Sequence, residues 1–92
     1  MKIKLQGMGY LREFLGREPQ SVELHENSTL KDLLEWIGTH HAERFPPYLW
    51  DATQHQFRGP IMLVVDGKMT VDTSTPLREG LEVNVMYAVA GG

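Results

Sequence analysis

The sequence contains no cysteine, which excludes disulfide bonds, thiolate metal sites and a cysteine nucleophile. It also lacks long apolar runs, since the stretches at 61–65 and 85–90 are far shorter than the roughly 20 residues that cross a bilayer. The first six residues lack the apolar core of a signal peptide. We therefore expect a cytoplasmic protein that has no membrane partner.

Positive charge is scarce as well. Nine Lys and Arg residues stand against twelve Asp and Glu residues, which gives a formal net charge of −3. Proteins that bind nucleic acid normally have a surplus of basic residues. The composition therefore predicts no nucleic-acid partner.

Motifs of enzymes are few. His40 and His41 are adjacent, and neighbouring helical positions point about 100° apart, so the two rings cannot chelate a metal as an i, i+4 pair does. The segment Gly7-Met8-Gly9 is not followed by the rest of a phosphate-binding motif. We therefore expect no catalytic residue, and no metal or cofactor bound by the chain itself.

The sequence does have clear strand periodicity. Apolar and polar residues alternate over 1–6 and again over 21–25, which predicts two strands that pair with each other. Residues 61–65 are all apolar, which predicts a central strand covered on more than one side. Asp66-Gly67 is typical of a two-residue hairpin turn, and alternation over 81–89 predicts the last strand.

One long helix is indicated between these strands. Its apolar residues recur at i, i+3, i+4 and i+7, and they are Leu30, Leu33, Leu34 and Ile37. Thr29 and Asp32 resemble a capping box at its start. We expect the helix to end between Gly38 and Arg44, because the prolines at 46–47 cannot continue it.

Two irregular segments complete the pattern. Residues 11–15 predict a short turn or helix that ends at Gly16 in the left-handed helical conformation. The connection 46–60 is long and contains Tyr48, Trp50 and Phe57, whose rings we expect to pack under the loop.

The predicted order of elements is β-β-α-β-β-β in one domain, residues 1–92. Because the helix has one apolar stripe, a four- or five-stranded mixed sheet packed on that one main helix is the compact solution. The first and last strands can lie side by side and parallel, joined by a right-handed crossover. The fold class is therefore α+β.

The sequence ends in Val89-Ala90-Gly91-Gly92. Directly after a strand, two glycines provide a slim segment that exposes only backbone and a carboxylate. We expect residues 90–92 to be a flexible tail that threads a narrow channel, with Ala90 and Gly91 inside it and the Gly92 carboxylate at the reacting centre.

The order of elements, the segments 65–68 and 76–83, and Gly91-Gly92 together resemble the ubiquitin-like sulfur carriers (MoaD/ThiS-like). Within these, the chain is most similar to the small subunit of molybdopterin synthase, and next to the thiamine-pathway sulfur carrier. Residues 10–16 also match a short turn that is common in the molybdopterin branch. The resemblance implies the ubiquitin-like β-grasp fold.

The resemblance also implies a mechanism. An E1-like adenylyltransferase uses ATP and Mg²⁺ to adenylate the carboxylate of Gly92, and a persulfide sulfur then displaces AMP to leave a thiocarboxylate. The sulfur passes to an acceptor in a partner, which for a molybdopterin-type carrier is the large subunit of molybdopterin synthase. The carrier itself is not an enzyme, because its reactive atom is added to its chain end.

A partner-docking surface follows from the parity of the last strand. If Val83 and Val85 face the helix, Met86 faces outward beside the tail, near Met62 or Val64. The predicted docking residues are Met86, Tyr87, Val89 and Arg78. An equally open reading places Met86 in a second small core under the long loop. For Arg78, a solvated turn residue is favoured over a contact at the rim of the docking surface.

Two other functions remain open at this stage. A ubiquitin-like protein modifier would join Gly92 to lysines, and it needs the same activated Gly-Gly end. A third reading is an interaction module with no chemistry at its C-terminus. The pathway that receives the sulfur is also open: molybdenum, tungsten, thiamine or another.

Overall fold

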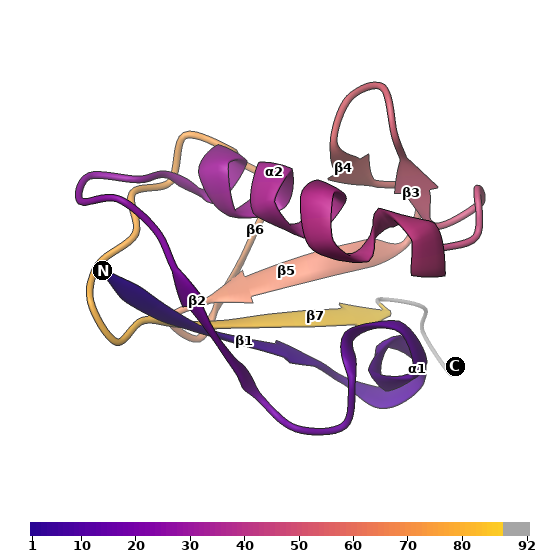
Figure 1. The fold of residues 1–92 in the computed structure, drawn as a ribbon, viewed down its shortest axis with the longest axis horizontal. Coiled ribbons are helices and arrows are strands. Elements are labelled where there is room, and N and C mark those ends of the chain that lie inside the picture. Colours follow the sequence, from indigo (N-terminus) through magenta and orange to yellow (C-terminus); the bar gives the residue numbers. More distant parts are fainter. Residues whose placement is uncertain (88–92) are drawn as a thin grey trace.

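The computed structural model describes residues 1–87, and a five-stranded sheet with a helix across one face is its main feature (Figure 1). The strands lie in the order β2-β1-β7-β5-β6. Their bounds are β1 Lys2–Gly7, β2 Gln20–Glu23, β5 Ile61–Val65, β6 Lys68–Thr70 and β7 Glu82–Tyr87.

The two central strands are the first and the last. β1 and β7 are parallel, with Lys4 opposite Glu82 and Gly7 opposite Val85. β5 and β7 are antiparallel, and so are β1 and β2 and also β5 and β6. The predicted mixed sheet, with its parallel first and last strands, is therefore confirmed.

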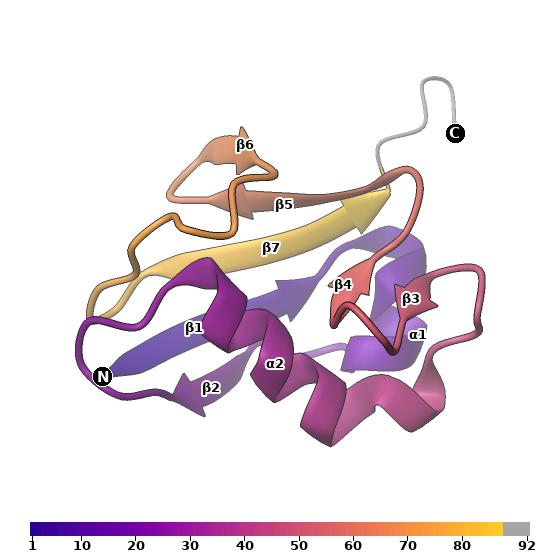
Figure 2. The same cartoon turned by 90° about the horizontal axis from the view of Figure 1, so that it is seen from above.

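Helix α2, Leu30–His41, begins and ends within the predicted limits. At its start the Asp32 carboxylate accepts hydrogen bonds from the Thr29 N–H at 2.7 Å and the Thr29 hydroxyl at 3.2 Å. A short 3₁₀ helix, η2 (Ala42–Arg44), continues it before the prolines. In Figure 2 the helix lies obliquely across the sheet, and its leucine stripe joins the core that the sheet provides.

The sheet has one covered face and one open face. On β5, Ile61, Leu63 and Val65 are buried against the helix side, whereas Met62 and Val64 are only half-buried. The prediction that β5 is covered on more than one side was therefore wrong. Its apolar run reflects an apolar patch on the open face, over which residues 1–87 place no second layer.

The short helix after β1 is a 3₁₀ turn, η1 (Gly9–Leu11), followed by α1 (Arg12–Leu15). Gly16 ends it with φ 96° and ψ 159°, so the predicted left-handed helical conformation was wrong. This positive φ is nevertheless one that residues other than glycine rarely adopt. The chain here turns into an extended segment that leads to β2.

The connection 46–60 contains a small hairpin, β3 (Trp50–Asp51) with β4 (Gln56–Phe57). Trp50 is buried and its ring packs on Phe57, as predicted. Tyr48 is 59% exposed, so the prediction that it packs under the loop was wrong. The hairpin packs against α2 at Gly38. A Cβ added to Gly38 would lie 2.6 Å from Nδ1 of His55, which belongs to the hairpin turn.

None of the helices within residues 1–87 is both long enough and apolar enough to cross a membrane. The prediction of a tail over residues 90–92 lies outside the described residues.

Candidate functional site

The open face of the sheet has a methionine-rich patch near the C-terminal end of β7. Met86 lies directly opposite Met62, and Val64 lies opposite both Asn84 and Met69. Residues opposite each other in antiparallel strands share a face, so four apolar side chains gather there. We call this set the open-face patch: Met62, Val64, Met69 and Met86.

The patch is accessible, because Met69 is 64% exposed and the other three are half-buried. Val83 and Val85, the covered-face neighbours of Met86 on β7, are fully buried. The reading of Met86 as outward-facing beside Met62 therefore matches the register, and residues 1–87 form no second core around it. Its role in docking stays a prediction.

The chain has three tyrosines, and all three meet at the end of β7. The Tyr10 and Tyr48 hydroxyls are hydrogen-bonded at 2.6 Å. The Tyr10 ring packs edge-on against Tyr87, with ring centroids 6.1 Å apart. These residues come from η1, from the loop before β3 and from the last described position. We call them the tyrosine cluster.

The tyrosine cluster is exposed to solvent, with accessible fractions between 39% and 59%. The hydrogen bond with the Tyr48 hydroxyl raises the pKa of Tyr10 to about 12. Tyr10 is therefore a neutral phenol near pH 7, and aromatic rings with a polar tip are favoured at protein interfaces. Sequence reasoning identified only Tyr87 here, because nothing in the pattern joins positions 10 and 48.

Arg78 does not belong to this site. Its guanidinium donates to the Asp66 carboxylate at 3.0 Å, and both side chains are mostly exposed. Asp66 follows Val65, which lies opposite Val83 near the start of β7. Arg78 therefore lies at the other end of the sheet from Met86, where it contacts the β5–β6 turn, and the structure does not place it beside Met86.

The remaining predicted site residues, Val89, Ala90, Gly91 and Gly92, lie outside the described residues. Met86 and Tyr87 are the last positions before them. Within residues 1–87, no group of three or more His, Cys, Asp or Glu side chains is arranged to hold a metal ion. His41 is buried instead among Trp36 and Phe45, and its Nε2 lies 3.2 Å from Oε1 of Gln20.

A mixed sheet with parallel first and last strands at its centre and one long helix across a face defines the ubiquitin-like β-grasp class. The sequence matches the ThiS family over residues 7–92, so the chain belongs to that family. The expected likeness to ubiquitin-like sulfur carriers is thereby confirmed. Small carriers of this kind are in general not themselves catalysts.

Solved structures share the fold. SAMP1 from Haloferax volcanii superposes with a TM-score of 0.78 at 17% identity, over 100% of each chain. A putative molybdopterin converting factor subunit 1 from Pyrococcus furiosus gives 0.73 at 24% identity, over 97% of this chain and 99% of that one. Urm1 from Trypanosoma brucei gives 0.74 at 20% identity, over 99% and 95%. Among curated proteins, no sequence matches this chain.

Proposed function

We propose that this chain is a sulfur carrier whose Gly92 carboxylate is adenylated and thiocarboxylated, and that it donates the sulfur for a molybdopterin-type cofactor of molybdenum or tungsten. The observation that supports this is the position of β7. It pairs with β1 as far as Val85 and with β5 as far as Tyr87, the last described residue, and only four residues separate Tyr87 from Gly92. A rigid central strand therefore presents a short glycine-ended segment.

The chemistry needs no catalytic group from the carrier. The Gly92 carboxylate attacks the α-phosphate of ATP on the activating enzyme, pyrophosphate leaves with Mg²⁺, and an acyl adenylate forms. The terminal sulfur of a persulfide then attacks the carbonyl carbon and AMP leaves. A second thiol of the sulfur donor cleaves the resulting acyl disulfide, which releases the thiocarboxylate and leaves a disulfide on the donor.

The partners are an E1-like adenylyltransferase and then a sulfur acceptor, equivalent to the large subunit of molybdopterin synthase. The open-face patch and the tyrosine cluster flank the end of β7, so a partner that receives Gly92 meets them first. Accessible apolar side chains beside a reactive segment suit such contacts. Met86 and Tyr87 are the proposed docking residues, with Val89, Ala90 and Gly91 following inside the channel.

Reconstitution with an E1-like enzyme, ATP, Mg²⁺ and a persulfide donor tests the proposal. We expect the intact mass to show one oxygen replaced by one sulfur. Deleting Gly92, or adding one alanine after it, should abolish this change, because reacting atoms misplaced by about 1 Å already lose roughly 10²-fold in rate. An N-terminal alanine extension is the matched control. Exchange in the extended or deleted chain would contradict the proposal.

The destination of the sulfur is tested separately, with the thiocarboxylated protein. Its sulfur should pass to a pterin precursor on a synthase large subunit and not to the thiazole precursor of thiamine. Transfer to the thiazole precursor alone would assign the chain to the thiamine pathway. A chain that binds partners but never gains sulfur would instead be an interaction module.

A ubiquitin-like modifier is the second candidate. The observation that favours it is a fold shared with an H. volcanii small archaeal modifier protein, over 96% of this chain and 98% of that one, at a TM-score of 0.75. The two roles separate in native cells. We expect tagged protein to be recovered as free chain or thiocarboxylate. Abundant denaturant-resistant conjugates with a Gly92-to-lysine isopeptide bond would put the modifier role first.

A further inference from the structure

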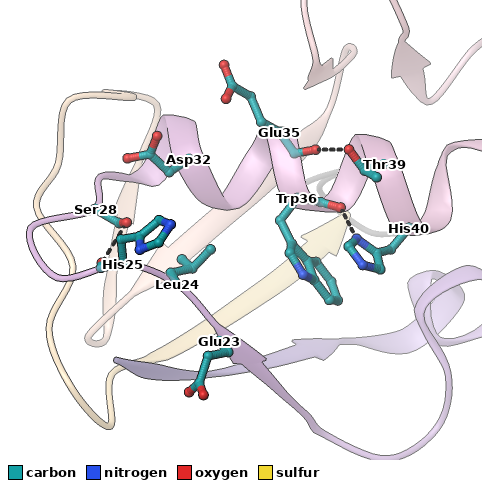
Figure 3. Close-up of a pocket in the computed structure, with 9 residues that line it drawn as sticks. All are labelled: Glu23, Leu24, His25, Ser28, Asp32, Glu35, Trp36, Thr39 and His40. Atoms are coloured by element: carbon teal, nitrogen blue, oxygen red, sulfur yellow. Dashed lines mark hydrogen bonds between the residues drawn. The ribbon is translucent and has the colours of Figure 1, made fainter.

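A second surface lies far from the end of β7, in a groove between strand β2 and helix α2. The groove has a volume of about 380 Å³ and is lined by Glu23, Leu24, His25, Ser28, Asp32, Glu35, Trp36, Thr39 and His40. Figure 3 shows Trp36 and His40 pointing from the helix toward the strand side, with Leu24 across from them. The groove therefore has an apolar and aromatic floor.

The aromatic part of the groove floor is held in place. The Trp36 and His40 rings are stacked, with centroids 4.1 Å apart and planes 17° apart. Nδ1 of His40 donates to the Trp36 carbonyl at 2.9 Å, which fixes the imidazole over the helix. Trp36 remains half-buried, so part of the indole faces the groove.

One side of the groove is the edge of the sheet. β2 is the terminal strand in the order of the described sheet. Met1 and Leu24 exchange both backbone hydrogen bonds, at 2.8 and 3.0 Å. In an antiparallel ladder hydrogen-bonded and non-bonded pairs alternate, so Glu23, opposite Lys2, and Ser21, opposite Lys4, direct their N–H and C=O groups away from β1. This edge is therefore a template for one more strand.

The charged residues around the groove indicate which kind of ligand it can bind. Three of its nine lining residues are acidic, and none is Lys or Arg. Glu23 and Glu35 take part in neither of the ion pairs within residues 1–87. In Figure 3 their side chains lie at the rims, directed away from the floor. The groove therefore combines an apolar floor with acidic rims.

We propose that this groove binds an extended peptide segment of a partner protein, in which aliphatic residues are flanked by lysine or arginine. The segment adds a strand to the free edge of β2. Its aliphatic side chains seat on Leu24 and Trp36, and its basic ends meet Glu23 and Glu35.

The groove is independent of the proposed sulfur chemistry. Glu23 lies opposite Lys2 at the start of β1, whereas the end of β7 lies beside Gly7 at the end of β1. The two surfaces are therefore at opposite ends of the sheet. A peptide in the groove leaves the open-face patch and the end of β7 free for another partner.

A capped synthetic peptide, Lys-Arg-Val-Ile-Val-Leu-Lys-Arg, is the probe. In an NMR titration we expect it to shift the Ser21 and Glu23 amides and the Trp36 indole signal. Two matched peptides serve as controls. One has Glu and Asp at its ends, and the other carries N-methyl groups on alternate central residues, which removes its hydrogen-bond donors. We expect both to bind at least about tenfold more weakly.

Variants of the protein provide a second test of the proposed peptide binding. Glu35→Lys should weaken the basic peptide about two- to fivefold, whereas Glu43→Lys, an exposed charge outside the groove, should not. Glu23→Pro removes an outward N–H and should weaken binding more than Glu23→Gln, which removes only the charge. Equal binding of all three peptides, or shifts that map to Met62 and Met86 instead, would overturn the proposal.

Discussion

The two faces of the sheet differ in what their side chains do. On β7, Val83 and Val85 are fully buried on the helix side of the sheet, while the alternate residues Asn84 and Met86 remain half-buried on the other face. The same strand thus contributes to the core and to an accessible apolar patch, one residue apart. Stability depends on the first set, and partner binding is proposed for the second.

The sharpest way to break this contrast is to place a charge on each face in turn. Val85→Asp should abolish cooperative folding, because an unpaired carboxylate would replace a fully buried side chain. Met86→Asp should keep the fold and weaken binding to the activating enzyme. Circular dichroism with urea titration measures the first effect, and a binding titration the second. Unfolding of Met86→Asp would show that the open face belongs to the core.

A smaller loss is expected at the point where η1 closes over the covered face. An added Cβ on Gly7 would lie 2.8 Å from the Leu11 carbonyl oxygen and 3.2 Å from Cβ of Leu15. Backbone cannot move aside as a flexible side chain does, so Gly7→Ala should cost about 1–3 kcal/mol of unfolding free energy. Urea titration measures it, and an unchanged midpoint would show that η1 shifts freely.

The buried His41 makes the free energy of unfolding depend on pH. Burial, followed by the nearby Arg44 and His40 charges, lowers its pKa below the ordinary value of 6.5. The unfolded chain therefore binds more protons, so this contribution to stability is complete above pH 6.5 and decreases as pH falls toward the lower folded pKa. His41→Gln should flatten the unfolding free energy in that interval, and the exposed His25→Gln should not. A slope unchanged in His41→Gln would contradict this assignment.

The smallest change is expected in the tyrosine cluster at the end of β7. Tyr48→Phe removes the hydroxyl that raises the pKa of Tyr10, so the Tyr10 pKa should return toward its ordinary value of 10.0. Spectrophotometric titration of the phenols measures this, while the unfolding midpoint should hardly move. A Tyr10 pKa that stays near 12 would show that another group holds it.

The periodic elements of the fold were predictable from sequence because each periodicity reflects one face. Leu30 to Ile37 repeat at helical spacing since one stripe meets the sheet, and β1 alternates since one side is buried. The same reasoning failed for β5, because Met62 and Val64 make its sequence uniformly apolar although their face is open. An apolar surface patch and a second core have the same sequence pattern.

The site was predictable only in part. Strand parity places Met86 outward and beside Met62, as the register has it. The meeting of Tyr10 with Tyr48 depends on a contact 38 positions apart in the sequence, which no local pattern encodes. The groove between β2 and α2 was missed for the same reason, because it forms only when the strand edge and the helix are brought together.

The central claim is that partners of Gly92 dock on the open face at the end of β7. Its most direct test is a methyl NMR spectrum of the protein labelled at its five methionines, recorded while the E1-like enzyme is added. The Met62 and Met86 methyl signals should shift or broaden first, and that of Met1 should not. Unchanged Met62 and Met86 signals in a complex that still thiocarboxylates Gly92 would contradict the claim.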